Sequence, residues 1–254
     1  MDTNGYQFTK NLFTLILSVT WSYRCGLVAN PESCQTRMQF IVATHNTHKT
    51  REIEQILKPG LAVRDLTAYP EISQIAETGT SFEENAKLKA LAVSKKLSGL
   101  VIADDSGLEV EGLGGAPGIH SARYAGTNAS DQEKIAKLLR QLAKVGAKSD
   151  QRRARFRCVL AVARAGQILA TIEGVVEGKI AEQPRGSHGF GYDPVFIPDG
   201  FEETFAELPE HLKNNISHRA KAIRKLQAKL LTLCGGVYGF GAGGGAGGGG
   251  APGG

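Results

Sequence analysis

Two adjacent aspartates, Asp104 and Asp105, follow a run of four apolar residues, Leu100 to Ala103, within the sequence LVIADDSGLEVEG. The run predicts a short buried strand, and two ionised carboxylates at its end would repel each other and lose hydration. A cation, a network of hydrogen bonds or open solvent has to compensate for that cost. Mg²⁺ is one such cation, because it binds a few carboxylates together with phosphate oxygens and water. A solvated turn explains the pair equally well.

A second polar segment, Thr44 to Lys49 (THNTHK), lies between an apolar run and a helix-like pattern. Hydroxyls, an amide, helix-end N–H groups and a lysine converge in it, as a polyphosphate site requires, although the spacing is not that of a P-loop. The alternative is a polar helix cap with an exposed lysine. Open α/β sheets place ligands at the carboxyl ends of adjacent strands. We therefore expect this segment and the aspartates to face one cleft.

The elements that must position these residues alternate between strand-like and helix-like patterns over residues 38–234, which indicates an α/β domain. The patterns predict strands at 39–44 and 100–103, a hairpin over 152–178 that turns near residues 165 and 166, and helices at 47–58, 82–97, 130–145 and from 217 onwards. Capping boxes are expected at Ser81 with Glu84 and at Ser130 with Glu133. The third helix is expected to be scaffold alone, with an apolar face of Ile135, Leu138, Leu139, Leu142 and Val145.

Basic residues gather at two places outside the first polar segment. The last helix is predicted to begin at Ser217, so His218 and Arg219 fall in its first turn, where two potential cations beside free backbone N–H groups suit an anion. Three arginines share one face of the predicted hairpin, Arg153, Arg155 and Arg157. A solvated strand face is favoured there over a phosphate clamp.

Composition sets only broad bounds. The formal net charge of +5 suits a protein that handles anions, but it also fits a plain soluble enzyme. The four cysteines contain no C-x-x-C spacing, so neither a zinc site nor a disulfide framework is indicated and a reducing compartment is expected.

Both ends of the chain differ from the middle. The apolar run at residues 12–19 is shorter than the roughly 18 residues that cross a bilayer, and its flanks are poor for a signal peptide. We expect residues 1–37 to be a disordered extension or a mis-called start that precedes Met38. Residues 235–254 are expected to be a disordered glycine-rich tail, whose G-x-G-x-x-G match lacks the strand and helix that a dinucleotide site needs.

Five motifs, in order and at their spacing, resemble the non-canonical purine nucleoside triphosphate pyrophosphatases, also described as inosine or xanthosine triphosphate pyrophosphatases. The motifs are FIVATHNTHK, AETGTSFEENAKLKA, IADDSGLEVEGLGGAPGIHSARYAG, GFGYDPVF and NNISHRAKA, and the resemblance covers residues 38–231. The departures are at His45 and His48, where glycine is more frequent in the family.

The resemblance implies an α/β fold with a long central mixed sheet flanked by helices, two lobes with an active-site cleft between them, and a homodimer. It also implies a cytoplasmic enzyme that uses Mg²⁺ to hydrolyse ITP, dITP or XTP to the monophosphate and pyrophosphate, which cleanses the nucleotide pool. The expected partner is the nucleoside triphosphate, with no nucleic acid and no membrane.

The resemblance assigns roles by matching motifs. Residues implied to hold the phosphates are Thr44, His45, Asn46, Thr47, His48 and Lys49. Glu77 and Asp105 are implied to bind the metal, Asp105 also to act as the base, and Ser106 to bind the substrate. Residues implied to shape the nucleoside pocket are Phe190, Gly191, Tyr192, Asp193, Lys213, His218 and Arg219.

The sequence leaves two possible roles open for each of three residues. Asp104 is either a partner of the metal ligands or an outer ligand. Asn85 and Lys89, one helical turn apart, either face the phosphates or serve as exposed or capping residues.

Two rival functions are a nucleotide sensor without catalysis and a basic RNA-binding protein. A sensor has no need of Glu77 and the aspartate pair around a metal. An RNA-binding protein should carry exposed aromatic residues among its arginines, and the segment RRARFR has a single one, Phe156. The acidic residues therefore favour the enzyme.

Overall fold

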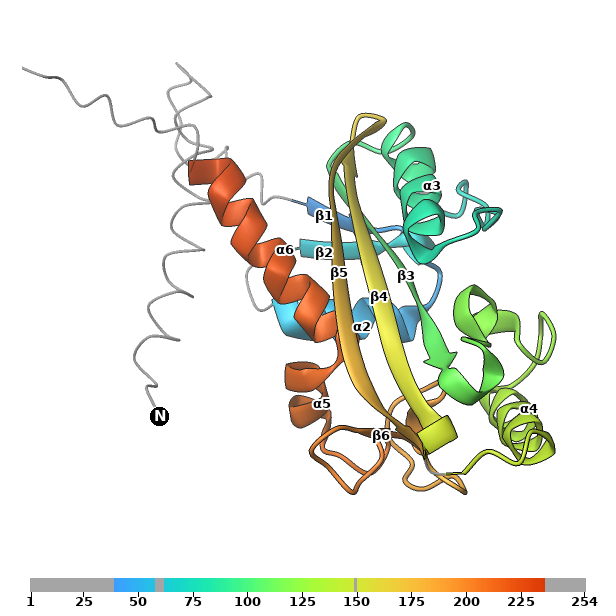
Figure 1. The fold of residues 1–254 in the computed structure, drawn as a ribbon. Coiled ribbons are helices and arrows are strands. Elements are labelled where there is room, and N and C mark those ends of the chain that lie inside the picture. Colours follow the sequence, from blue (N-terminus) through green and yellow to red (C-terminus); the bar gives the residue numbers. More distant parts are fainter. Residues whose placement is uncertain (1–38, 58–61, 149, 236–254) are drawn as a thin grey trace, which may run out of the picture. The chain divides into compact units, whose positions relative to one another are not determined.

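The computed structural model describes residues 39–57, 62–148 and 150–235 (Figure 1). The described residues from Gln39 to Gln227 belong to one compact unit, and all the contacts described below lie within it. The predictions for residues 1–37 and for the tail beyond Gly235 lie outside the described residues. None of the described helices is both long enough and apolar enough to cross a membrane.

A mixed six-stranded sheet with the strand order β2-β1-β3-β4-β5-β6 forms the centre of this unit (Figure 1). The strands are β1 (Gln39–Val42), β2 (Ala62–Asp65), β3 (Leu100–Val110), β4 (Arg153–Arg164), β5 (Gln167–Ile180) and β6 (Phe196–Pro198). The helices are α2 (Thr47–Leu57), α3 (Phe82–Ser94), α4 (Asp131–Lys144), α5 (Glu210–Ile216) and α6 (His218–Gly235). β1 pairs in parallel with β2 and β3, and the remaining neighbours are antiparallel.

The predicted α/β class, the first strand, the hairpin and four of the helices are confirmed. The strands and the helix that were not predicted are short: β2 has four residues, β6 three and α5 seven. So few residues do not repeat a period of 2 or 3.6 often enough to be recognised.

β3 is longer than predicted, and this changes the setting of the aspartates. The strand has eleven residues instead of four, so Asp104 and Asp105 lie in its middle, paired with Leu160 and Val159 of β4. β1 pairs with β3 only as far as Ile102. The prediction that the aspartates follow the end of a short strand is therefore wrong, because pairing with β4 extends the strand through two charged residues.

The two faces of β3 are covered by different helices. Side chains of successive strand residues point to opposite faces. Asp105 faces α3, where the Lys89 ammonium contacts it, whereas Asp104 faces the beginning of α6, where Arg219 contacts it. Gly174 of β5 lets α6 approach closely, because a Cβ there would lie 2.1 Å from the carbonyl oxygen of His218.

Two clusters of buried apolar residues flank the aspartates along β3. One cluster contains Val101 and Ala103, and the other contains Leu108 and Val110. The carboxylates thus occupy the polar interval between two hydrophobic cores, which fixes their backbone on both sides.

The helix caps agree in part with the prediction. Ser130 and Glu133 form the expected reciprocal capping box of α4. At α3 the Ser81 side chain accepts from the Glu84 N–H, but the Glu84 carboxylate accepts from the N–H and hydroxyl of Thr80 instead, and α3 ends at Ser94, three residues before Leu97.

The buried face of α4 yields a test of the packing. Replacing Leu138, which is fully buried, with Ala should lower the free energy of unfolding by about 2–5 kcal/mol, because a cavity remains. Val145 was predicted to be buried but is 51% exposed, since it lies beyond the last turn of α4. Val145→Ala should therefore change stability by less than about 0.5 kcal/mol. Equal losses in urea unfolding would contradict this assignment of the core.

Candidate functional site

The segment after β1 is held by its own side chains. The Thr44 hydroxyl accepts a hydrogen bond from the Asn46 N–H at 3.1 Å, and Asn46 Oδ1 accepts from the N–H groups of His48 (3.0 Å) and Lys49 (3.4 Å). Asn46 is thus a polar cap of α2, as the alternative interpretation held. The His45 side chain takes no part in these hydrogen bonds, and its Nε2 lies 3.2 Å from the carbonyl oxygen of Ile72.

The Lys49 side chain is mostly buried and forms an ion pair. Its Nζ lies 2.6 Å from Asp104 Oδ1, and 17% of its side chain is exposed. The segment after β1 and the middle of β3 are therefore joined by an ion pair, as expected from their predicted proximity.

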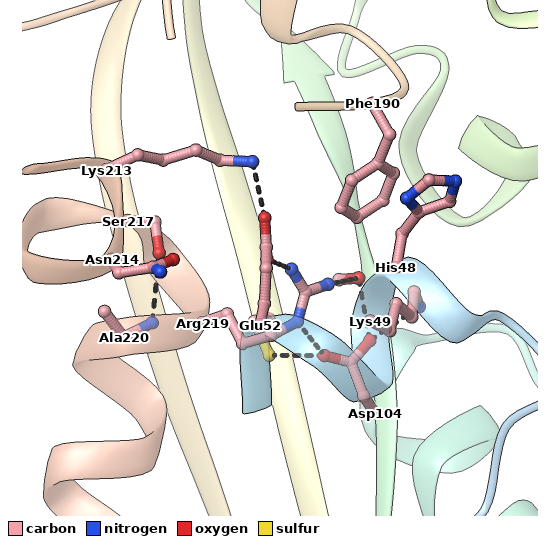
Figure 2. Close-up of polar contacts among 12 residues, drawn as sticks. His48, Lys49, Glu52, Asp104, Phe190, Lys213, Asn214, Ser217, Arg219 and Ala220 are labelled. Atoms are coloured by element: carbon pink, nitrogen blue, oxygen red, sulfur yellow. Dashed lines mark hydrogen bonds and ion pairs between the residues drawn. The ribbon is translucent and has the colours of Figure 1, made fainter. Parts of the chain in front are cut away.

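Asp104 is completely buried, and each of its two carboxylate oxygens accepts two hydrogen bonds (Figure 2). Lys49 Nζ and the Ser106 hydroxyl (2.8 Å) donate to Oδ1, while Arg219 Nε (2.8 Å) and the Cys158 thiol (3.1 Å) approach Oδ2. Burial alone would raise the pKa of Asp104, but the two cations hold it well below its ordinary value. The charge of Asp104 is thus balanced by the protein itself.

Asp105 has the opposite environment. Its Oδ1 accepts from Lys89 Nζ at 2.8 Å, whereas its Oδ2 is buried and has no hydrogen-bond partner among the described residues. Burial is the largest influence and raises the pKa of Asp105, with Glu77 adding to the rise and Lys89 opposing it. A buried acceptor without a donor is costly, so this oxygen is a candidate ligand or proton acceptor.

Lys89 connects the two carboxylates on this face. Its Nζ lies 2.8 Å from Glu77 Oε1 and 2.8 Å from the carbonyl oxygen of Asp104, in addition to its contact with Asp105. Burial would raise the pKa of Glu77, but Lys89 lowers it on balance. The alternative that Lys89 is an exposed or capping residue is excluded, since its side chain is 10% exposed.

Asn85 lies one turn before Lys89 on α3 and is also buried. Its Oδ1 accepts from the Gly79 N–H at 2.8 Å, which ties the segment after Glu77 to the helix. Its Nδ2 has no hydrogen-bond partner among the described residues.

Glu77 and Asp105 are the residues that could hold a metal ion. No group of three or more histidine, cysteine or acidic residues in the described part of the chain has the arrangement of a metal site. Mg²⁺ does not require one, because it is usually bound through one or two carboxylates plus substrate phosphates and water. The unpartnered oxygen of Asp105 fits such an ion.

A row of buried charges extends from Arg219 to Asp193. Glu52 contacts the Arg219 guanidinium with one oxygen and Lys213 Nζ with the other, at 2.5 Å in the latter case. Lys213 Nζ also lies 2.6 Å from Asp193 Oδ2. Burial would raise the pKa of Glu52, but the two cations lower it on balance.

Glu52 is not among the site residues predicted from the sequence. A signal was present, because Glu52 lies three residues after Lys49 and four before Ile56, and therefore on the face of α2 that the sheet covers. A carboxylate on a predicted apolar face indicates a buried partner.

His218 is not one of the cations. Its ring is buried, stacks on Phe156 with centroids 4.7 Å apart, and leaves Nδ1 without a partner among the described residues. Burial, reinforced by the nearby Arg219, holds the pKa of His218 well below its ordinary value. The expectation of two cations at the start of α6 is thus wrong for His218, which is neutral at pH 7. Arg219 is charged, but Asp104 and Glu52 already bind it.

The segment GFGYD divides between site and core. Phe190 lies 5.3 Å from the ring of His48, whereas Tyr192 belongs to the hydrophobic core and donates through its hydroxyl to the carbonyl oxygen of Ser121 at 2.9 Å. The Gly191 N–H donates to Asp131 Oδ2 at 2.6 Å. Since Asp131 begins α4, this helix also fixes the segment and is more than scaffold.

Fold and site together define an α/β protein whose buried charges join the start of α2, the middle of β3 and the start of α6. A sequence model of the Ham1 family matches residues 40–229, and the chain belongs to this family.

Curated relatives include the dITP/XTP pyrophosphatase of Bacillus subtilis (strain 168), which is 53% identical over 192 residues, 75% of this chain and 96% of that protein. The dITP/XTP pyrophosphatase of Geobacillus kaustophilus (strain HTA426) is 50% identical over 199 residues, 78% of this chain and 97% of that protein. Among solved structures, a HAM1 protein from Coxiella burnetii matches with a TM-score of 0.70 and 38% identity, covering 77% of this chain and 99% of that one. The Ham1 protein of Staphylococcus aureus matches with a TM-score of 0.68, 42% identity and the same coverage.

The buried histidine predicts a pH dependence of stability. Because the folded state disfavours protonation of His218, the unfolded state binds the proton more readily, so its contribution to stability is complete above about pH 6.5 and falls as the pH decreases below that value. Lowering the pH from 7.5 to 5.5 should remove about 1 kcal/mol from the free energy of unfolding through this group alone. His218→Gln should be less stable at pH 7.5 but should lose less on acidification. Parallel pH profiles of the two proteins in urea unfolding would show that His218 is not buried in the neutral form.

Proposed function

We propose that this protein hydrolyses non-canonical purine nucleoside triphosphates, namely ITP, dITP and XTP, to the monophosphate and pyrophosphate. The observation that carries the proposal is the setting of Asp105, with one oxygen bound by Lys89 and the other buried and unpaired. Support also comes from the names of two relatives, the dITP/XTP pyrophosphatases of Bacillus subtilis and Geobacillus kaustophilus, which are 53% and 50% identical to this chain.

Asp105 acts as the base in this proposal. Lys89 binds Oδ1 and so orients the carboxylate, which accepts a proton from the attacking water. The raised pKa of Asp105, caused mainly by burial, makes its carboxylate a better proton acceptor than an exposed aspartate.

The triphosphate binds between the segment 44–49 and Lys89. Lys49 and Lys89 provide the cationic groups, and the backbone at the start of α2 faces the phosphates. Two further residues border this space from the face of β3 that α6 covers. The Ser106 hydroxyl donates to Asp104, and Arg219 Nη2 lies 3.1 Å from that hydroxyl.

Glu77 and Asp105 would hold a Mg²⁺ ion together with phosphate oxygens. Such an ion neutralises negative charge on the phosphates and makes a bound water more acidic. Lys89 keeps the two carboxylates together at 2.8 Å from each.

The buried cations account for the choice of base. A 6-oxo purine presents an acceptor where adenine presents an amino donor, and Arg219 and Lys213 can only donate. Glu52, Asp104 and Asp193 hold these cations in place, so the donors are fixed before the substrate binds.

The surroundings of the protein follow from the same proposal. We expect it to act as a homodimer in the cytoplasm on free nucleotides, so that it removes damaged purines from the pool. Against an RNA-binding role, Arg153 pairs with Asp199, and Arg155 and Arg157 both pair with Glu109. Their charges are already compensated on the strand face.

Removing the charge of Asp105 tests its role. Asp105→Asn should fold and should hydrolyse ITP about a hundredfold to ten-thousandfold more slowly, because the base is lost. The assay separates pyrophosphate from phosphate release over a panel of nucleoside triphosphates with Mg²⁺. Asp199→Asn, an exposed aspartate paired with Arg153, is the matched control and should retain its activity. Turnover by Asp105→Asn within tenfold of the wild type would contradict the assignment.

Base selection is tested at Arg219. Alanine would leave the buried carboxylates of Glu52 and Asp104 without their cation, so Arg219→Lys is the better substitution. It should lower the ratio of kcat/KM for ITP to that for ATP about tenfold or more, because a donor to the 6-oxo group is lost. An unchanged ratio in a folded variant would mean that other groups recognise the base.

A further inference from the structure

The carboxylate of Asp131 joins α4 to the segment that precedes β6. Asp131 is the first residue of α4, and Ser130 and Glu133 already form the capping box of this helix, so the helix start does not need the Asp131 carboxylate as a cap. Its Oδ2 accepts a hydrogen bond at 2.6 Å from the N–H of Gly191, which lies 60 positions away in the chain, and its Oδ1 accepts from Lys134 Nζ at 3.0 Å.

Asp131 is ionised in this setting. Burial would raise its pKa, but the Gly191 N–H, Lys134 and the nearby His48 lower it on balance. A hydrogen bond from a backbone N–H to an ionised carboxylate is shorter and stronger than one between neutral groups. The contact with Gly191 is therefore a strong restraint on the backbone of that segment.

The segment that Asp131 contacts contains two glycines with a left-handed backbone. The φ angle is 77° at Gly189 and 64° at Gly191, and Phe190 lies between them. Glycine adopts many backbone conformations when it is not restrained, so ordering such a stretch costs conformational entropy. The hydrogen bond from Gly191 to Asp131 supplies a restraint from outside the segment.

The same segment carries the carboxylate that fixes Lys213. Asp193 Oδ2 accepts from the Phe190 N–H at 2.9 Å and from Lys213 Nζ at 2.6 Å. Lys213 is one of the two cations that recognise the 6-oxo group in the proposed function. The conformation of the segment therefore sets the position of this donor.

We propose that Asp131 is a positioning residue for nucleobase recognition: through Gly191 it holds residues 189–193 in the conformation in which Asp193 fixes Lys213. This inference rests on the proposed function and extends it to a residue of α4. When the bond to Gly191 is lost, the segment populates other conformations, and the apparent affinity for the base falls with the fraction of molecules in the competent one.

The phosphate side of the site has restraints of its own. The Thr44 hydroxyl accepts from the Asn46 N–H, and Lys49 is bound to Asp104. Loss of the Asp131 carboxylate should therefore weaken the binding of the base and leave the binding of the phosphates unchanged. General damage to the fold would weaken both.

The first experiment measures by calorimetry, in the presence of Mg²⁺, the binding of IMP, which carries a base, and of inorganic tripolyphosphate, which carries none. Asp131→Ala should weaken IMP binding about tenfold or more and change tripolyphosphate binding less than about twofold. Asp131→Asn keeps an oxygen that can accept from the Gly191 N–H, so it should bind IMP within about threefold of the wild type. Lys134→Ala removes only the ion pair of Asp131, and this matched control should bind both ligands as the wild type does.

The second experiment measures amide hydrogen exchange by NMR and reports on the hydrogen bond itself, without any ligand. The Gly191 N–H should exchange about tenfold faster or more in Asp131→Ala than in the wild type. The Leu108 N–H, which donates to the Ser121 hydroxyl at 2.9 Å, is the internal control and should exchange at the wild-type rate.

Three results would overturn the proposal: unchanged IMP affinity in Asp131→Ala, an equal loss of IMP and tripolyphosphate affinity, or unchanged exchange of the Gly191 N–H. Failure of the proposed function is seen separately. Wild-type protein that releases no pyrophosphate from ITP would refute the activity, whereas the exchange rate of Gly191 and the affinity for IMP would still test the role of Asp131.

Discussion

The buried carboxylate of Asp104 is the constraint on which the rest of the site depends. An ionised group inside the protein must be compensated, and its partners come from α2 (Lys49), β4 (Cys158) and α6 (Arg219). Removing either cation would leave a buried charge without its pair, which typically costs about 3–5 kcal/mol. One carboxylate therefore fixes the positions of a helix start, a strand and a second helix start relative to one another.

The alternation of side chains along β3 gives the adjacent aspartates different tasks. Asp104 faces the beginning of α6 and has both oxygens saturated, whereas Asp105 faces α3 and keeps one oxygen unpaired. The pKa of Asp104 is lowered by its cations, and that of Asp105 is raised by burial. Neighbouring titratable groups whose pKa values are moved in opposite directions are typical of sites in which one group organises and the other reacts.

A second compensated row, from Arg219 through Glu52 and Lys213 to Asp193, extends this organisation toward Phe190. Acidic and basic groups alternate along this row. The neighbouring carboxylates therefore keep each buried cation in its protonated, charged form. Donors fixed in this way need little reorganisation when a ligand binds. The row ends at the aromatic pair of Phe190 and His48, where the buried charges give way to the exposed part of the site.

The sequence by itself determined the features that depend on near neighbours: the α/β class, the hairpin predicted over residues 152–178, the capping box of Ser130 with Glu133, and the proximity of the segment 44–49 to the aspartates. Tertiary structure alone decided the length of β3, the exposure of Val145, the partnership of Glu52 and the neutral state of His218. The physical reason is the range of the interactions involved. Periodicity and capping act within one or two turns of chain, whereas strand pairing and the compensation of a buried charge depend on residues more than fifty positions away, such as β4 for Asp104 and Arg219 for Glu52.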